Sequence, residues 1–171
     1  MTVINTPRQF REFHAIQHEY EGTLPTDLQH DLPTAADLPA VYAQPNAAFL
    51  GSVDGQPAGA VAAVRLDATT DVLQRLYVRP AFRGAGLARA LVAAVIDRAR
   101  ARGCRRVVLD TDRDRMSAAY RLYQSFGFTE RAPYGAVRPG CPTYMELGLE
   151  QQRNTSSRRR AAVRRNRGSC C

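Results

Sequence analysis

The stretch VRPAFRGAGLARALV, residues 78–92, decides the fold of this chain. A strand pattern ends at Val78, and Pro80 marks the turn that follows it. Gly84 and Gly86 then lead into a helix whose apolar residues recur at helical spacing, namely Leu87, Leu91, Val95 and Ile96. A strand therefore passes into a helix through a loop that contains two glycines.

Such a loop is suited to binding phosphate. The first N–H groups of a helix lack intrahelical partners and carry partial positive charge, so a phosphate can bind directly to the backbone. Gly84 and Gly86 leave the backbone accessible, and Arg83 can add a charge-assisted contact. The loop is not a Walker P-loop, because no Gly-Lys-Ser/Thr ends it. It is not GxGxxG either, because Arg89 stands in place of the third glycine.

The residues RGAGLA, 83–88, resemble the R/Q-x-x-G-x-G/A signature of the GNAT superfamily of N-acetyltransferases, in which this loop holds the pyrophosphate of acetyl-coenzyme A. A second segment, SAAYRLYQSFGF, residues 117–128, resembles the A-x-x-x-Y-x-x-x-G-F helix of the same superfamily. The matching residues are Ala119, Tyr123, Gly127 and Phe128. For one motif alone, an ordinary tight turn between a strand and a helix is a sufficient explanation, whereas two motifs in the expected order favour the family.

The resemblance implies an α/β (α+β) fold with a mixed, mainly antiparallel central sheet flanked by helices on both faces. Strands are expected at 48–53, 58–66, 71–78, 107–111, from 128 onward and at 143–149, with an Asp54-Gly55 hairpin turn between the first two. Helices are expected at 6–22, near 36–42, from 87 to Gly103, and at 116–126. On the third of these helices, Arg98, Arg100 and Arg102 are expected to point mostly outward.

Composition indicates one domain at 1–149 and an arginine-rich tail at 150–171 that we expect to be disordered. The chain has 171 residues and a net charge of +8, and all 24 basic residues are arginine. The tail holds seven arginines and one glutamate, so +6 of the +8 lies there. The apolar runs are too short to span a membrane and the N-terminus lacks an apolar signal region, so we expect a cytoplasmic protein. The four cysteines lack metal-ligand spacing, and no metal is expected.

The resemblance also implies where acetyl-coenzyme A binds. In the family two strands splay apart, and the pantetheine arm lies in the gap and bonds to free backbone groups. The residues expected to bind the cofactor are Leu76, Tyr77 and Val78 on the strand and Arg83, Gly84, Ala85, Gly86, Leu87 and Ala88 in the loop and first helical turn. Backbone donors directed at a developing oxyanion are each worth about 3 kcal/mol in acyl-transfer enzymes.

Tyr123 is the expected catalytic side chain, because the family places a tyrosine at this position near the sulfur of coenzyme A. A phenol can protonate the departing thiolate. The alternative is that Tyr123 only packs against the neighbouring apolar residues Leu122, Phe126 and Phe128.

The general base is left open by the sequence. The acidic position found on this strand in many family members is Val72 here, with Asp71 beside it; water leading to Asp110 or Asp112 is another route. Arg75 has two interpretations, an ion pair with Asp110 or a bidentate contact to the carboxylate of an amino-acid-like substrate. Tyr134 is expected to border the same substrate pocket.

The function expected is transfer of acetyl from acetyl-coenzyme A to the primary amine of a small molecule by direct attack. The alternative is a catalytically weak coenzyme-binding protein of the same fold whose basic tail contacts nucleic acid through its arginines. A homodimer is also left open.

Overall fold

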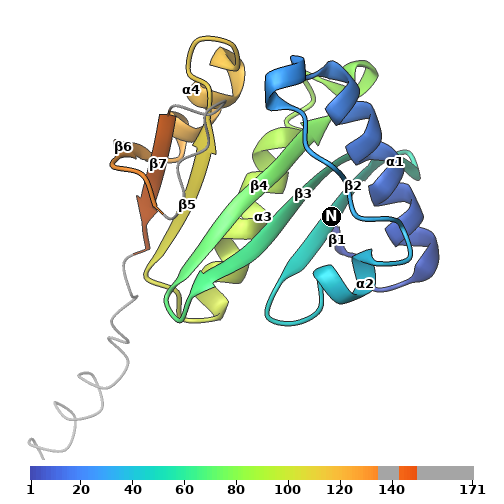
Figure 1. Cartoon of the computed structure of the whole chain (residues 1–171), viewed down its shortest axis with the longest axis horizontal. Helices are drawn as coiled ribbons and strands as arrows, with labels where there is room; N and C mark the ends of the chain where they lie inside the picture. Colours follow the sequence, from blue (N-terminus) through green and yellow to red (C-terminus); the bar gives the residue numbers. More distant parts are fainter. Residues whose placement is uncertain (135–142, 150–171) are drawn as a thin grey trace, which may run out of the picture.

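The computed structural model describes residues 1–134 and 143–149, and it contains one seven-stranded sheet (Figure 1). The strand order is β1-β2-β3-β4-β5-β7-β6, and every neighbouring pair is antiparallel except β4 and β5. The strands are β1 (Thr2–Val3), β2 (Ala47–Val53), β3 (Gln56–Asp67), β4 (Thr70–Val78), β5 (Arg106–Thr111), β6 (Thr129–Arg131) and β7 (Thr143–Gly148). The prediction of a mixed, mainly antiparallel sheet is confirmed. The two-residue strand β1 was not predicted.

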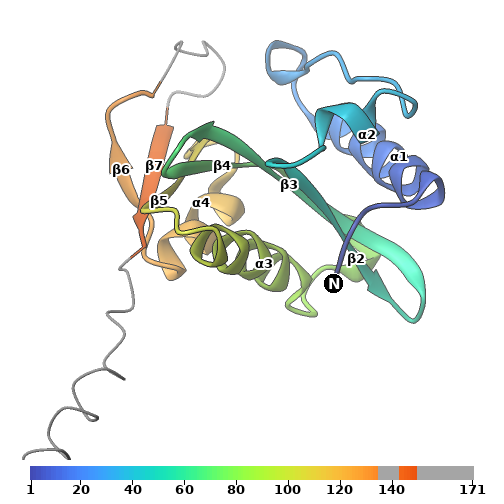
Figure 2. The ribbon, with the colours of Figure 1, turned by 90° about the horizontal axis from the view of Figure 1, so that it is seen from below.

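Helices cover both faces of the sheet, as predicted. They are α1 (Pro7–Thr23), α2 (Leu38–Val41), α3 (Leu87–Ala101) and α4 (Ser117–Ser125), with single 3₁₀ turns at η1 (Thr26–Leu28) and η2 (Pro80–Phe82). Figure 2 shows α1 and α2 on one side of β2 to β4 and α3 and α4 on the other. α1 begins at the capping box that Thr6 forms with Gln9, where the Gln9 amide donates to the Thr6 hydroxyl at 3.3 Å.

The alternation of side chains along β2 and β3 divides the core into two layers. On β2, Phe49 packs in the cluster under α3, while Leu50 packs in the cluster under α1. On β3, Val61 and Ala62 divide in the same way. This is the period of two expected for a sheet covered on both faces.

β4 changes this alternation in its middle. Ala60 of β3 pairs with Tyr77, but Ala62 pairs with Gln74, so two steps along β3 correspond to three along β4. The additional residue is a β-bulge, and Arg75 within it has a left-handed φ of 58°. One inserted residue reverses which side chains face which layer. Leu73 and Val78 therefore both pack toward α3, five positions apart, and Tyr77 packs toward α1.

Beyond the bulge, β4 leaves its parallel neighbour. Within the described residues, β4 and β5 pair only at residues 70–72 with 106–108, although β4 continues to Val78 and β5 to Thr111. Figure 1 shows the two strands diverging toward their carboxyl ends. The second half of β4 therefore has a strand partner on its β3 side and an open backbone edge on its β5 side.

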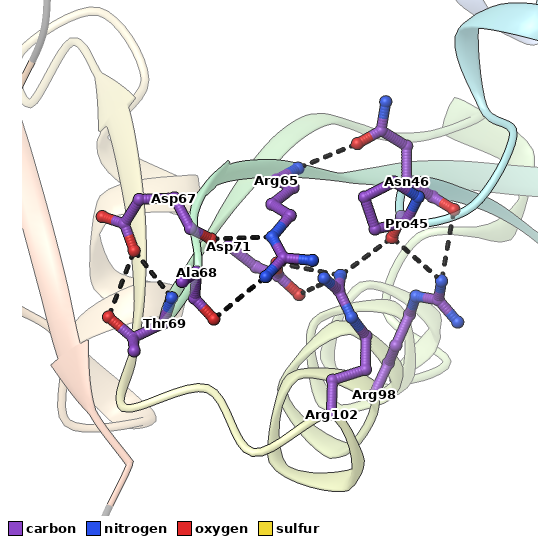
Figure 3. Close-up of polar contacts among 9 residues, drawn as sticks. All are labelled: Pro45, Asn46, Arg65, Asp67, Ala68, Thr69, Asp71, Arg98 and Arg102. Carbon is purple, nitrogen blue, oxygen red and sulfur yellow. Dashed lines mark hydrogen bonds and ion pairs between the residues drawn. The ribbon is translucent and has the colours of Figure 1, made fainter.

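Where β4 and β5 are still paired, an ion pair joins β4 to the end of α3 (Figure 3). Asp71 is fully buried, and Nη1 of Arg102 donates to its two carboxylate oxygens at 3.0 and 3.1 Å. Arg102 and Arg98 also donate to the carbonyl oxygen of Pro45, at 2.8 and 3.1 Å. The expectation that these arginines point outward is wrong for Arg98 and Arg102, because backbone carbonyls and a buried carboxylate lie within their reach. Arg100 is exposed, as expected.

The predicted disordered tail at 150–171 lies outside the described residues, and so do three of the four cysteines for which no metal-ligand spacing was found. The fourth, Cys104, is buried as a free thiol, and burial raises its pKa. Among the described helices, none is both long and apolar enough to cross a membrane. Residues 1–134 and 143–149 also hold no cluster of three or more His, Cys, Asp or Glu side chains arranged for a metal ion.

Candidate functional site

The loop between β4 and α3 has the backbone geometry of an anion cradle. Gly84 and Gly86 have left-handed φ values of 84° and 78°, and Gly86 is the N-cap of α3. The Ala90 amide donates to the Gly86 carbonyl at 3.1 Å and begins the helical hydrogen bonds, so the amides of the first turn have no partner within the helix. A Cβ atom built on either glycine meets no atom within 4 Å. The backbone at these two glycines is therefore unobstructed on the side where a Cβ would stand.

A cavity of about 430 Å³ runs from the open edge of β4 to this loop. Eight of the nine predicted cofactor residues line it: Leu76, Tyr77, Val78, Arg83, Gly84, Gly86, Leu87 and Ala88. Ala85 lies between the two glycines of the loop. Phe82, Arg89, Ala118, Ala119 and Leu122 complete the lining and were not predicted. The cavity thus joins the strand edge expected for pantetheine to the helix terminus expected for phosphate.

Arg83 links the loop to the end of β4. Its Nε donates to the Val78 carbonyl at 3.0 Å, and its guanidinium lies 5.8 Å from the centre of the Tyr77 ring. These contacts hold a positive charge at the mouth of the cradle.

A second cavity, of about 270 Å³, adjoins the middle of β4. Its lining comes from α1 and the segment after it, from β4 and β5, and from α4, and includes Tyr20, Glu21, His30, Asp31, Arg75, Asp110 and Tyr123. Leu76 and Ala119 line both cavities. The two cavities therefore adjoin each other at these two residues.

Tyr123 lines the second cavity and also packs in the core. It is 6% exposed, and its ring centre lies 5.8 Å from that of Phe128. Burial, followed by the proximity of Tyr20 and Asp110, raises the pKa of the Tyr123 phenol far above its usual value. The hydroxyl therefore keeps its proton at all physiological pH values.

Asp110 is the one of the three candidate bases that lines the second cavity among the described residues. Its Oδ1 accepts a hydrogen bond from the Tyr134 hydroxyl at 3.0 Å, so Tyr134 reaches the site through Asp110. Asp71 is held by Arg102 where β4 and β5 are still paired. Asp112 accepts hydrogen bonds from the Arg115 backbone and side chain, which lower its pKa.

Arg75 pairs with Glu21 of α1 instead of Asp110, and this corrects the predicted ion pair. Its Nη1 lies 3.0 Å from Glu21 Oε1, and the two side chains are 19% and 11% exposed. The bulge turns Arg75 toward α1, where Gln17 donates to the Arg75 carbonyl at 3.2 Å. Glu21 was not predicted as a site residue, because no local pattern shows where the end of α1 lies over the sheet.

Comparison with known proteins agrees with the resemblance noted in the sequence. The model of the Acetyltransferase (GNAT) family matches residues 10–128. N-acetyltransferase YjgM of Escherichia coli, described as uncharacterized, is 28% identical over 157 residues, covering 90% of this chain and 91% of that protein. Zebrafish N-acetylaspartate synthetase is 41% identical over 96 residues, which cover 54% of this chain but only 34% of that protein. The solved structure of yncA from Salmonella typhimurium with its cofactor acetyl-CoA shares the fold, with a TM-score of 0.71 at 22% identity over 89% of this chain and 95% of that one. The chain belongs to the acetyltransferase (GNAT) family.

Proposed function

We propose that this protein transfers the acetyl group of acetyl-coenzyme A to the primary amine of a small molecule by direct attack. The observation that carries the proposal is the meeting of two cavities at Leu76 and Ala119, one ending at the phosphate cradle and the other lined by titratable side chains. A binding protein for the coenzyme alone would need the first cavity but not the second.

The open edge of β4 supports a role for backbone groups in binding and catalysis. Pantetheine carries amide groups that can bond to the free edge of Leu76, Tyr77 and Val78, as an additional strand would. A backbone N–H at the end of this edge can stabilise the oxyanion that forms when the amine attacks the acetyl carbonyl, a contribution of about 3 kcal/mol.

Asp110 and Tyr123 would assist the reaction at the amine and at the departing sulfur. The amine nitrogen forms a bond to the acetyl carbon, the carbon–sulfur bond breaks, and the amine loses one proton while the thiolate gains one. Asp110 faces the second cavity and can accept the first proton, directly or through water. Even at its ordinary pKa a phenol is a weaker acid than a thiol, by about 2 kcal/mol. With its pKa raised further, Tyr123 would chiefly donate a hydrogen bond to the departing thiolate, which then takes its proton from solvent.

The cofactor site is tested by thermal melts of the full chain with and without acetyl-coenzyme A. Ligand at a hundred times its dissociation constant stabilises a protein by about 2.7 kcal/mol. Arg83→Glu reverses the charge at the cradle and should abolish the shift. Arg100→Glu, on the exposed side of α3, makes the same charge change away from it and should keep the shift. A full shift in Arg83→Glu would contradict the assigned site.

Catalysis is tested by release of free coenzyme A in the presence of a panel of amines. Release that requires an amine, and that falls by tenfold or more in Tyr123→Phe, would support transfer. A chain that binds acetyl-coenzyme A but releases no coenzyme A with any amine would favour the alternative, a coenzyme-binding protein without catalysis.

A further inference from the structure

The charges that line the second cavity indicate what kind of amine it accepts. We propose that the acceptor is an aliphatic amine that carries a second cationic group and no carboxylate, an inference that rests on the acetyltransferase function proposed above. Among the described residues, the lining holds three carboxylates, Glu21, Asp31 and Asp110, and one guanidinium, Arg75. Leaving His30 aside, these described side chains sum to a charge of −2, from three carboxylates and one guanidinium.

Arg75, the one arginine that the described residues contribute to this lining, is already engaged. It lies 3.0 Å from Glu21, and both side chains are mostly buried. Glu21 is fixed from its other side as well, because Oε2 accepts a hydrogen bond from the His30 amide at 2.8 Å. A substrate carboxylate that bound Arg75 would have to share this cation with the mostly buried Glu21 carboxylate, and two carboxylates close together on one cation repel each other. This geometry argues against an amino acid as the acceptor.

The remaining carboxylates lie at two depths. Asp110 is half-buried on β5, beside Tyr123 in the lining, and can attract the ammonium group that will react. Asp31 is exposed on the segment after η1, so it lies toward solvent and can attract a second cation. Five apolar side chains also form part of the wall, alongside Gln74 and Thr111: Leu24, Leu28, Leu73, Leu76 and Met116. Such a wall suits a chain of methylene groups.

Three related amines test the proposal, each in the coenzyme A release assay with the full chain. 1,4-Diaminobutane has two ammonium groups on a four-carbon chain, ornithine adds one carboxylate to that molecule, and butylamine lacks one of the ammonium groups. We expect kcat/KM to be highest for 1,4-diaminobutane and lower by at least about tenfold for each of the other two.

Asp31→Asn identifies the site of the second cation. It should raise KM for 1,4-diaminobutane several-fold with kcat little changed, as expected for a contact made equally in the ground and transition states, and should leave butylamine unaffected. Asp54→Asn removes the same charge from the exposed β2–β3 turn and should change neither substrate.

Each result decides between the claims. Preference for ornithine would overturn the substrate class while supporting acetyl transfer. Equal rates with butylamine and 1,4-diaminobutane, or equal losses for both in Asp31→Asn, would overturn the second cation. If none of the three amines releases coenzyme A from a chain that acetyl-coenzyme A stabilises, the substrate class is wrong, and the wider amine panel decides the acetyltransferase function.

Discussion

Replacing Arg102 by methionine should destabilise the protein strongly, because it leaves a buried carboxylate without its cation. Asp71 is 0% exposed and receives two hydrogen bonds from Arg102, at 3.0 and 3.1 Å (Figure 3). Breaking such a pair from one side typically costs 3–5 kcal/mol. Arg98 lies beside Arg102 and keeps its own bond to the Pro45 carbonyl, so one nearby positive charge remains. We therefore expect about 3 kcal/mol, a large part of the 5–15 kcal/mol typical of a domain.

Urea unfolding followed by circular dichroism measures this loss as a lower midpoint at unchanged slope. Asp71→Leu combined with Arg102→Met removes both charges and should recover most of the lost free energy, since apolar replacement of a buried pair is often close to neutral. Arg100→Met, on the exposed side of the same helix, is the matched control and should change stability by less than about 0.5 kcal/mol. A loss below about 1 kcal/mol in Arg102→Met, or a double variant as unstable as the sum of the singles, would refute the reasoning.

Three further substitutions have definite expected outcomes. Gly86→Ala imposes a left-handed backbone on an L-residue, so it should cost about 1–2 kcal/mol in urea unfolding and weaken acetyl-coenzyme A binding, whereas Gly22→Ala in α1 should do neither. Gly59→Ala places a Cβ 2.8 Å from the Tyr77 carbonyl, so its melting temperature should fall by several degrees; an unchanged value would contradict the close approach of β3 to β4. Tyr123→Phe should make the protein less sensitive to alkaline unfolding. Because burial raises the Tyr123 pKa, only the unfolded chain loses this proton above about pH 10. The wild-type free energy of unfolding therefore falls above that pH by up to about 1.4 kcal/mol per pH unit from this group. Below pH 10 this contribution is constant. If the free energy of unfolding fell equally steeply with pH above 10 in the wild type and in Tyr123→Phe, the buried state of the Tyr123 hydroxyl would be contradicted.

The elements that depend on local signals could be predicted from the sequence. The Thr6 cap, the Asp54-Gly55 hairpin and the glycine loop each depend on residues a few positions apart, and the structure places the adjoining elements within about two residues of their expected bounds. The cofactor cavity was predictable for the same reason, because its lining comes largely from one continuous stretch, residues 76–89.

The features that depend on distant parts of the chain could not be predicted. Glu21 and Arg75 are 54 residues apart, and their pairing depends on how α1 crosses the sheet. The bulge at Arg75 leaves no signal in the apolar pattern of TDVLQRLYV, yet it decides which side chains of β4 face each layer. Asp71 looked like a candidate base from its place in the sequence, and only the position of α3 shows that Arg102 neutralises it.

The two cavities also bear on how such a protein can diversify. In the proposed function, donor recognition would depend on residues 76–89. Much of the acceptor wall would come from residues 20–31, which contribute none of the described lining of the first cavity. Substitutions between Tyr20 and Asp31 can therefore accumulate, and the acceptor can change, while the cofactor loop stays under constant selection. Leu76 and Ala119 belong to both walls, so these two positions should vary least when acceptor preference drifts.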